Sequence, residues 1–131
     1  MKTALLVGRG ACVSSALCDL ITPGGVRIVC APDCATALRG LQEEGLRPRV
    51  VVLEAASAGA DAPSFLEQLR RSPRLRRAQV IVLAEHPTAA QALVVRHGAL
   101  GSLPRDVEDW RLLQVIDRLS GRRAPEAASR S

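Results

Sequence analysis

Short apolar runs and amphipathic stretches alternate along the whole chain. The apolar runs lie at residues 4–7, 27–31, 50–53, 80–83 and, more weakly, 101–103. Runs of this length that are rich in Val, Ile and Leu are typical of strands buried on both faces. Stretches with apolar positions at helical spacing follow them at residues 11–21, 34–43, 64–70, 88–97 and 107–119. The pattern therefore predicts five strand–helix units.

Strict alternation of strands and helices predicts an α/β fold with a central parallel sheet. Right-handed crossovers with helices on both faces favour a doubly wound, five-stranded, flavodoxin-like sheet with strand order 2-1-3-4-5. Residues 1–119 are expected to form this single domain, and residues 120–131, which lack periodicity, a disordered tail or linker stub. Asp106 is expected to cap the last helix, with Asp109 in its third position.

The composition is that of a compact globular domain. Apolar residues make up 47% of the 131 positions, and the mean hydropathy is +0.11. The sequence contains no apolar stretch near the roughly 20 residues that a membrane span needs. The apolar run at residues 4–7 is also too short for a signal peptide. We therefore expect a cytoplasmic protein.

The charge is basic, with a formal net charge of +5. Lys2 is the one lysine among 18 basic residues, and such arginine and alanine usage is typical of a GC-rich bacterial genome. The densest basic run, at residues 70–77, contains no aromatic side chain on which a base could stack. We therefore expect a solvated basic face, and direct nucleic-acid binding is not expected.

The reactive side chains form no recognisable catalytic or metal-binding set. The chain has four cysteines, Cys12, Cys18, Cys30 and Cys34, which in a cytosolic protein are expected to be small buried hydrophobes. No second Cys or His pair completes a tetrahedral metal site, because His86 and His97 are isolated. No Ser–His, Cys–His or paired-carboxylate set lies at a strand end. We expect neither a cofactor nor an enzymatic activity.

Several segments resemble the receiver domains of bacterial two-component response regulators. Segment 48–54 resembles the strand that ends in their phosphoacceptor Asp, and segment 74–83 resembles the approach to their fourth strand. Segment 25–33, followed by Ala37 and Leu38, resembles their second strand and helix, and His97-Gly98-Ala99 with Leu103 their turn into the fifth strand. The resemblance covers residues 3–119 and implies a flavodoxin-like fold and a role in bacterial signal transduction.

The positions that the resemblance assigns to the phosphorylation pocket all depart from the family's pattern. Gly8 and Arg9 replace the acidic pair that binds magnesium, and Glu54 replaces the phosphoacceptor Asp. The other departures are Ala84 for the phosphate-sensing Thr or Ser, Ser102 for the switch aromatic, Arg105 for the Lys, and Asp106 for the following Pro. Magnesium needs several oxygen ligands, and phosphoryl transfer needs its charge. We therefore expect a degenerate pocket that is not phosphorylated.

These departures favour a protein-interaction module that works independently of phosphorylation, either alone or ahead of an effector domain. Glu54 could act as a built-in phosphate mimic, or it could pair with Arg9, Arg105 or both. We favour the pairing, because the switch residues are absent. The alternative function is a small-ligand or nucleotide sensor that uses the Gly8-Arg9-Gly10 turn with Asp33. Against it, Val13 occupies the place of the fingerprint's third glycine.

Receivers commonly dimerise or bind partners through the face built by their fourth helix, fifth strand and fifth helix. In the predicted helix at residues 88–97, which corresponds to that fourth helix, the outward positions are unusually uncharged: Ala89, Ala90, Leu93 and His97. They lie opposite two residues that are expected to be buried, Ala92 and Val95. Trp110, the only Trp, could fold over Leu113 and cover the helix end, or it could anchor an apolar contact patch. The second interpretation predicts a homodimer or a protein partner on this face.

Overall fold

The computed structural model describes residues 2–8, 20–55, 62–86, 88, 91, 94–96 and 98–121. Within them the chain forms the strands β1 (Lys2–Val7), β2 (Val26–Ala31), β3 (Val50–Glu54), β4 (Gln79–Ala84) and β5 (Gly101–Pro104). The helices are α2 (Cys34–Glu43), α4 (Ala62–Arg71) and α6 (Asp109–Gly121), and residues 88, 91 and 94–96 are also helical. Each predicted strand is confirmed to within two residues at either end.

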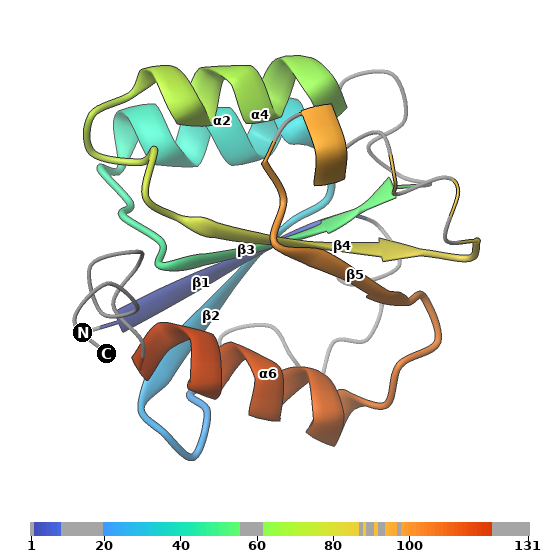
Figure 1. Cartoon of the computed structure of the whole chain (residues 1–131). Coiled ribbons are helices and arrows are strands. Elements are labelled where there is room, and N and C mark those ends of the chain that lie inside the picture. The colour runs from blue at the N-terminus through green and yellow to red at the C-terminus, as the bar shows by residue number, and fades with distance from the viewer. Residues whose placement is uncertain are drawn as a thin grey trace, which may run out of the picture.

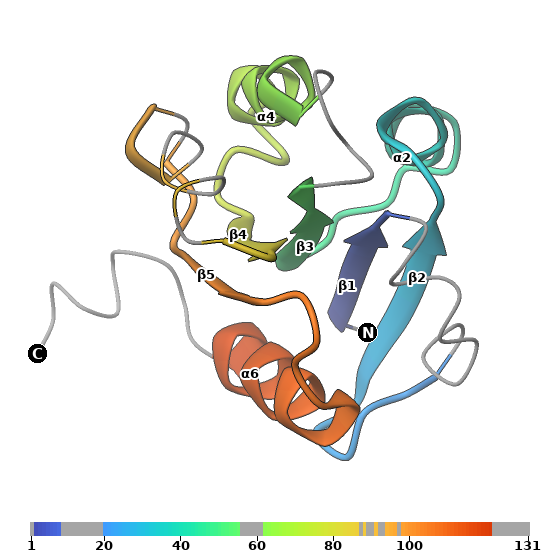
Figure 2. The ribbon, with the colours of Figure 1, turned by 90° about the vertical axis from the view of Figure 1, so that its right-hand side faces the viewer.

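The strands form one parallel sheet in the order β2-β1-β3-β4-β5, which confirms the predicted order and fold class. Helices α2 and α4 cover one face of the sheet, and α6 covers the other (Figures 1 and 2). None of the described helices is both long and apolar enough to cross a lipid bilayer.

The core consists of two apolar layers, one on each face of the sheet. Successive side chains of a strand point to opposite faces, so Leu5 joins the layer under α2 and α4 while Leu6 joins the layer under α6. Val51 and Val52 divide in the same way, and both are fully buried. Burial on both faces is the reason that these strands are continuous apolar runs.

The start of the last helix differs from the prediction. Helix α6 begins at Asp109, and Asp106 does not cap it. The cause is a turn before the helix, in which the Val107 amide donates to the Pro104 carbonyl at 3.1 Å and Val107 packs against the core. The helix runs to Gly121, two residues past the predicted end. Residues 122–131 lie outside the described residues, so the expected tail there stays a prediction.

Most of the first predicted helix, residues 11–19, lies outside the described residues, and its predicted end is wrong. Ile21 is not helical: it forms an isolated antiparallel bridge with Arg27, and its side chain is 54% exposed. A turn follows it, in which the Thr22 amide donates to the Val26 carbonyl at 2.8 Å. The Thr22 hydroxyl donates to Asp117 of α6, so this turn holds the helix against the sheet.

Arg70, at the end of α4, organises the loop that leads to β4. Its guanidinium donates to three backbone carbonyls, those of Arg76 at 2.6 Å, Ala78 at 2.9 Å and Gly98 at 3.0 Å. Burial lowers the pKa of this guanidinium. Arg70 therefore belongs to the scaffold, although the sequence placed it in a solvated basic run.

Candidate functional site at the carboxyl edge of the sheet

The site lies where the parallel strands end together. Gly8 follows β1, Glu54 is the last residue of β3 and Ala84 is the last residue of β4. Arg105 follows β5, and its amide donates to the Ala84 carbonyl at 3.1 Å. The backbone therefore brings Gly8, Glu54, Ala84 and Arg105 to one edge, as the predicted strand order requires.

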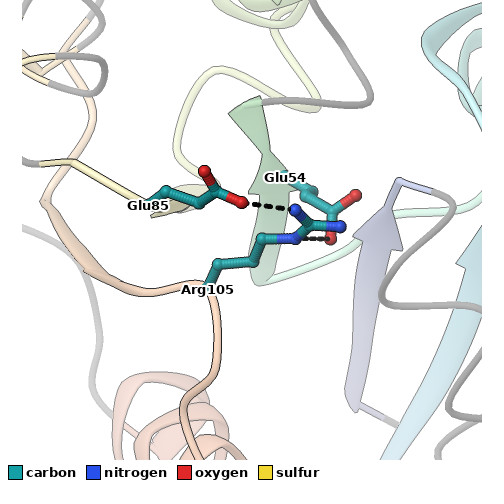
Figure 3. A network of polar contacts seen from close by, with 3 residues as sticks. All are labelled: Glu54, Glu85 and Arg105. Carbon is teal, nitrogen blue, oxygen red and sulfur yellow. Dashed lines mark hydrogen bonds and ion pairs between the residues drawn. The ribbon is translucent and has the colours of Figure 1, made fainter.

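Arg105 joins two carboxylates across this edge (Figure 3). Its Nε atom lies 3.7 Å from Glu54 Oε2, and its Nη1 atom lies 2.7 Å from Glu85 Oε1. The Glu54 side chain is only 3% exposed, whereas those of Arg105 and Glu85 are 45% and 60% exposed. The predicted pairing of Glu54 with an arginine is therefore confirmed for Arg105. Arg9, the other predicted partner, lies outside the described residues.

Gly8 approaches Glu54 too closely to carry a side chain. Its φ of 141° lies in a region that other residues rarely adopt, and a Cβ atom there would lie 2.5 Å from Glu54 Cβ. Its amide donates to the Ala31 carbonyl at 2.9 Å, which fixes the turn. With this backbone, an acidic residue at position 8 would not fit unless β1 or β3 moved.

The remaining predicted pocket residues lie nearby in different environments. Ala84 is buried at 7% exposure, and Ser102 is exposed on the edge strand β5. Beside Arg105 there is an open depression of about 420 Å³, lined by Glu85, Pro104, Arg105 and Asp106. Glu85 is the site residue that sequence reasoning missed. The sequence did carry a signal for it: Glu85 directly follows a buried strand and is next to Ala84, the position where receivers carry a hydroxyl.

The predicted interaction surface comprises the helical segment before β5 and the start of α6. Ala89, Ala90, Leu93 and His97 lie outside the described residues. Val95, expected to be buried, is instead 74% exposed. The reason is that its neighbour Val94 packs against the core layer, and adjacent helical residues point in directions about 100° apart.

Trp110 is the other apolar residue predicted for this face. Its side chain is 59% exposed, and its indole N–H donates to Glu108 Oε2 at 3.0 Å. Leu100, just before β5, is also exposed, at 56%. A side chain this exposed favours the interpretation as a contact patch over the one in which Trp110 folds over Leu113, and both stay predictions.

Asp33, which the nucleotide alternative placed at the end of the second strand, has a structural role. Its carboxylate caps α2 by accepting from the Thr36 amide at 2.7 Å. Arg9 and Gly10 of the glycine-rich turn lie outside the described residues. Of the cysteines, Cys34 is buried and Cys30 half-buried, while Cys12 and Cys18 lie outside the described residues. No group of three potential metal ligands occurs within the described part of the chain.

Glu54→Ala is expected to lower the free energy of unfolding by about 1–3 kcal/mol, because it removes a buried carboxylate and one of the partners of Arg105. Denaturant unfolding measures this change. Glu85→Ala, which removes the exposed partner of the same arginine, should cost less than about 1 kcal/mol. Equal losses in the two variants would show that the buried ion pair does not organise this edge.

Comparison with known proteins identifies the fold. No protein-family model matches the sequence, and no curated protein matches it. Solved structures do match. The receiver domain of a sensor histidine kinase from Pseudomonas aeruginosa PAO1, solved with magnesium coordinated in its active-site cleft, matches with a TM-score of 0.72 and 19% identity. The match covers 92% of this chain and 98% of that one.

Two response regulators give similar values. A putative response regulator from Chloroflexus aurantiacus matches with a TM-score of 0.72 and 21% identity, covering 92% of this chain and 98% of its own. A response regulator from Thermotoga maritima matches with a TM-score of 0.73 and 15% identity, covering 93% and 99%. The chain therefore has the fold of response-regulator receiver domains.

Proposed function

We propose that this domain is a bacterial cytoplasmic signalling module that binds partner proteins without being phosphorylated and without catalysing a reaction. The observation that carries the proposal is the contact set around Glu54. In receiver domains the third strand ends in the phosphoacceptor Asp, and in this chain Glu54 is the last residue of the third strand. Here its side chain is buried, paired with Arg105 and packed against the bare backbone of Gly8.

Within the described part of the chain, the residues at this edge do not fit the magnesium ion that phosphotransfer in a receiver fold uses. Magnesium binds oxygen ligands in near-octahedral geometry, commonly with one or two carboxylates. Gly8 offers no side-chain oxygen, and the Arg105 guanidinium lies 3.7 Å from a Glu54 oxygen, which disfavours a second cation there. The carboxylate of Glu85 also lies nearby, but it is held on the outer side of the same guanidinium.

The same contacts favour a fixed conformation over a phosphate-mimicking switch. A switch needs two states that a charge at position 54 would bias. Arg105 already joins Glu54 to Glu85, Ala84 offers no hydroxyl, and Ser102 offers no aromatic ring to move between positions. Signalling would then depend on whether the partner is present.

Magnesium and a small-molecule phosphodonor should leave the melting temperature of the domain unchanged. The reason is that a ligand stabilises a protein only by binding its folded state. Differential scanning fluorimetry with magnesium, acetyl phosphate and both together measures this. A receiver domain with an intact acidic pocket, treated in parallel, should be stabilised. A saturable shift in the present domain would contradict the proposal.

We propose that partners bind at the edge of the sheet formed by β5, together with the helical residues 94–96 and α6 beside it. Three large apolar side chains are exposed there, those of Val95, Leu100 and Trp110. Large aromatic side chains dominate the energetics of many interfaces. Trp110→Glu is therefore expected to abolish self-association or partner binding and to leave the circular dichroism spectrum unchanged. Gln42→Glu, an equal charge change on the exposed surface of α2 and away from this face, is the control.

Light scattering and partner pull-down distinguish the outcomes. Loss of mass or of a partner in Trp110→Glu alone supports this face. Unchanged mass and an unchanged partner set in both variants would place the working surface elsewhere.

A further inference from the structure

The amino-terminal edge of the sheet carries exposed arginines that neither the candidate site nor the β5 face uses. We define the basic edge as six residues of the loops before β3 and β4 and the end of α4: Arg47, Arg49, Arg71, Arg74, Arg76 and Arg77. All six are exposed, and none forms an ion pair with a carboxylate in the described part of the chain. Because the strands are parallel, this edge lies opposite Glu54.

The two loops of the basic edge lie side by side. The Arg49 amide donates to the Thr3 carbonyl at 2.8 Å, and the Arg49 carbonyl accepts from the Gln79 amide at 2.9 Å. The start of β3 is therefore bonded to the starts of both of its neighbours, β1 and β4. Figure 1 shows the two loops turning at the same end of the sheet. The loops that carry these arginines therefore lie at the same end of the sheet, where Arg49 Nη1 also donates to the Ser120 carbonyl of α6 at 3.5 Å.

The loop before β4 is held rigidly. Its centre is anchored by Leu75, which is 6% exposed and belongs to the core. The amides of Leu75 and Arg76 both donate to the Ser72 carbonyl, at 3.1 and 2.9 Å, and Arg70 binds two further carbonyls of the loop. The like charges are held together despite their mutual repulsion, and a ligand need not order the loop backbone when it binds.

We propose that the basic edge binds an acidic segment of a partner protein. Guanidinium groups present paired N–H donors that match the two oxygens of a carboxylate. A segment with several Asp or Glu residues would neutralise arginines from both loops at once. This surface is separate from the candidate site, so the proposal stands whether or not Glu54 can be phosphorylated.

Two other occupants fit the surface less well. Glu43 and Glu44 are exposed at the end of α2, next to the loop that carries Arg47. A short acidic segment can bind the arginines and stay clear of these two carboxylates, whereas a continuous phosphate backbone is less able to avoid them. These loops also contain no aromatic side chain for base stacking. A second copy of the chain is also a poor match, because Glu85 and Glu108 at its opposite edge are already bound by Arg105 and Trp110.

Fluorescence anisotropy with a labelled peptide of alternating glutamate and alanine tests the proposal. The wild-type protein should bind it more tightly than the glutamine–alanine counterpart, and added salt should weaken the binding. Arg74→Glu with Arg77→Glu should weaken binding about tenfold or more, since two exposed charge pairs are reversed. Arg39→Glu with Arg111→Glu makes the same change in net charge on exposed residues outside the basic edge. It should change the affinity less than about twofold.

Circular dichroism checks that each variant is folded, and Arg74→Gln with Arg77→Gln replaces the double reversal if it is not. Absence of peptide binding by the wild-type protein would overturn the proposal. So would equal losses in the two charge-reversed variants, since only net charge would then matter. Tighter binding of duplex DNA than of the peptide would overturn it in favour of nucleic acid. Self-association that the basic-edge variant abolishes would overturn it in favour of a second copy.

Discussion

Gly8→Ala is expected to lower the free energy of unfolding by about 3–5 kcal/mol, a cost that combines a strained backbone dihedral with overpacking. At φ 141° an alanine is strained, and its Cβ would lie 2.5 Å from Glu54 Cβ. Glu54 Cβ is bonded directly to the main chain of β3, so it cannot rotate away from the added methyl group. Relief therefore requires β1 and β3 to move apart, although they are hydrogen-bonded neighbours. Denaturant unfolding measures the loss.

Gly25→Ala separates the two causes. Gly25 also has a positive φ, 86°, but a Cβ atom there meets nothing within 4 Å. It should therefore show only the dihedral cost, about 1–2 kcal/mol. In a Glu54→Gly background, where the opposing Cβ is absent, Gly8→Ala should cost less than it does in the wild-type protein. Equal effects at the two glycines, with no relief in that background, would contradict the close contact between Gly8 and Glu54.

Arg70→Ala is expected to destabilise the domain by about 2–4 kcal/mol, because charged hydrogen bonds to several backbone carbonyls are lost together. The three carbonyls come from the loop before β4 and from the segment before β5, so both segments lose an anchor. Arg70→Lys should recover little of the stability, since an ammonium group cannot reproduce the forked geometry. Thermal and denaturant unfolding both measure the change.

Arg71→Ala is the control for this prediction. Arg71 is the next residue, but it is exposed, so its loss should change the free energy of unfolding by no more than about 0.5 kcal/mol. If Arg70→Ala proved as mild as Arg71→Ala, the loop would be held by Leu75 and its backbone bonds alone.

The fold and the central ion pair could be predicted because they depend on patterns that the sequence carries directly. Burial on both faces makes β3 and β4 unbroken apolar runs, and alternation with helices sets the parallel order. In that order the ends of β3 and β5 face one edge, which brings Glu54 towards Arg105. The identities of the two residues then predict the pair.

Other features could not be predicted because their partners are backbone atoms or depend on small rotations. Arg70 belongs to a run of arginines, and only the folded loop supplies the carbonyls that bind it. The close approach of Gly8 to Glu54 is set by the distance between strands. The sequence predicted that Val95 is buried, but the residue that packs against the core is its neighbour Val94. One position along a helix corresponds to a rotation of about 100°.

The predicted start of α6 shows a further limit. Asp106, Glu108 and Asp109 lie together, and acidic residues are all favourable near a helix N-terminus. The sequence therefore offered several possible starts for the helix. The turn that buries part of Val107 selects the later one.

Intact-protein mass spectrometry after incubation with magnesium and acetyl phosphate tests the central claim most directly. A receiver domain with an intact acidic pocket, treated in the same reaction, shows that the phosphodonor is active. The account predicts that the mass of the present domain is unchanged in both the wild-type protein and Glu54→Gln. A stoichiometric, hydroxylamine-labile gain of one phosphoryl group in the wild-type protein that Glu54→Gln abolishes would contradict it.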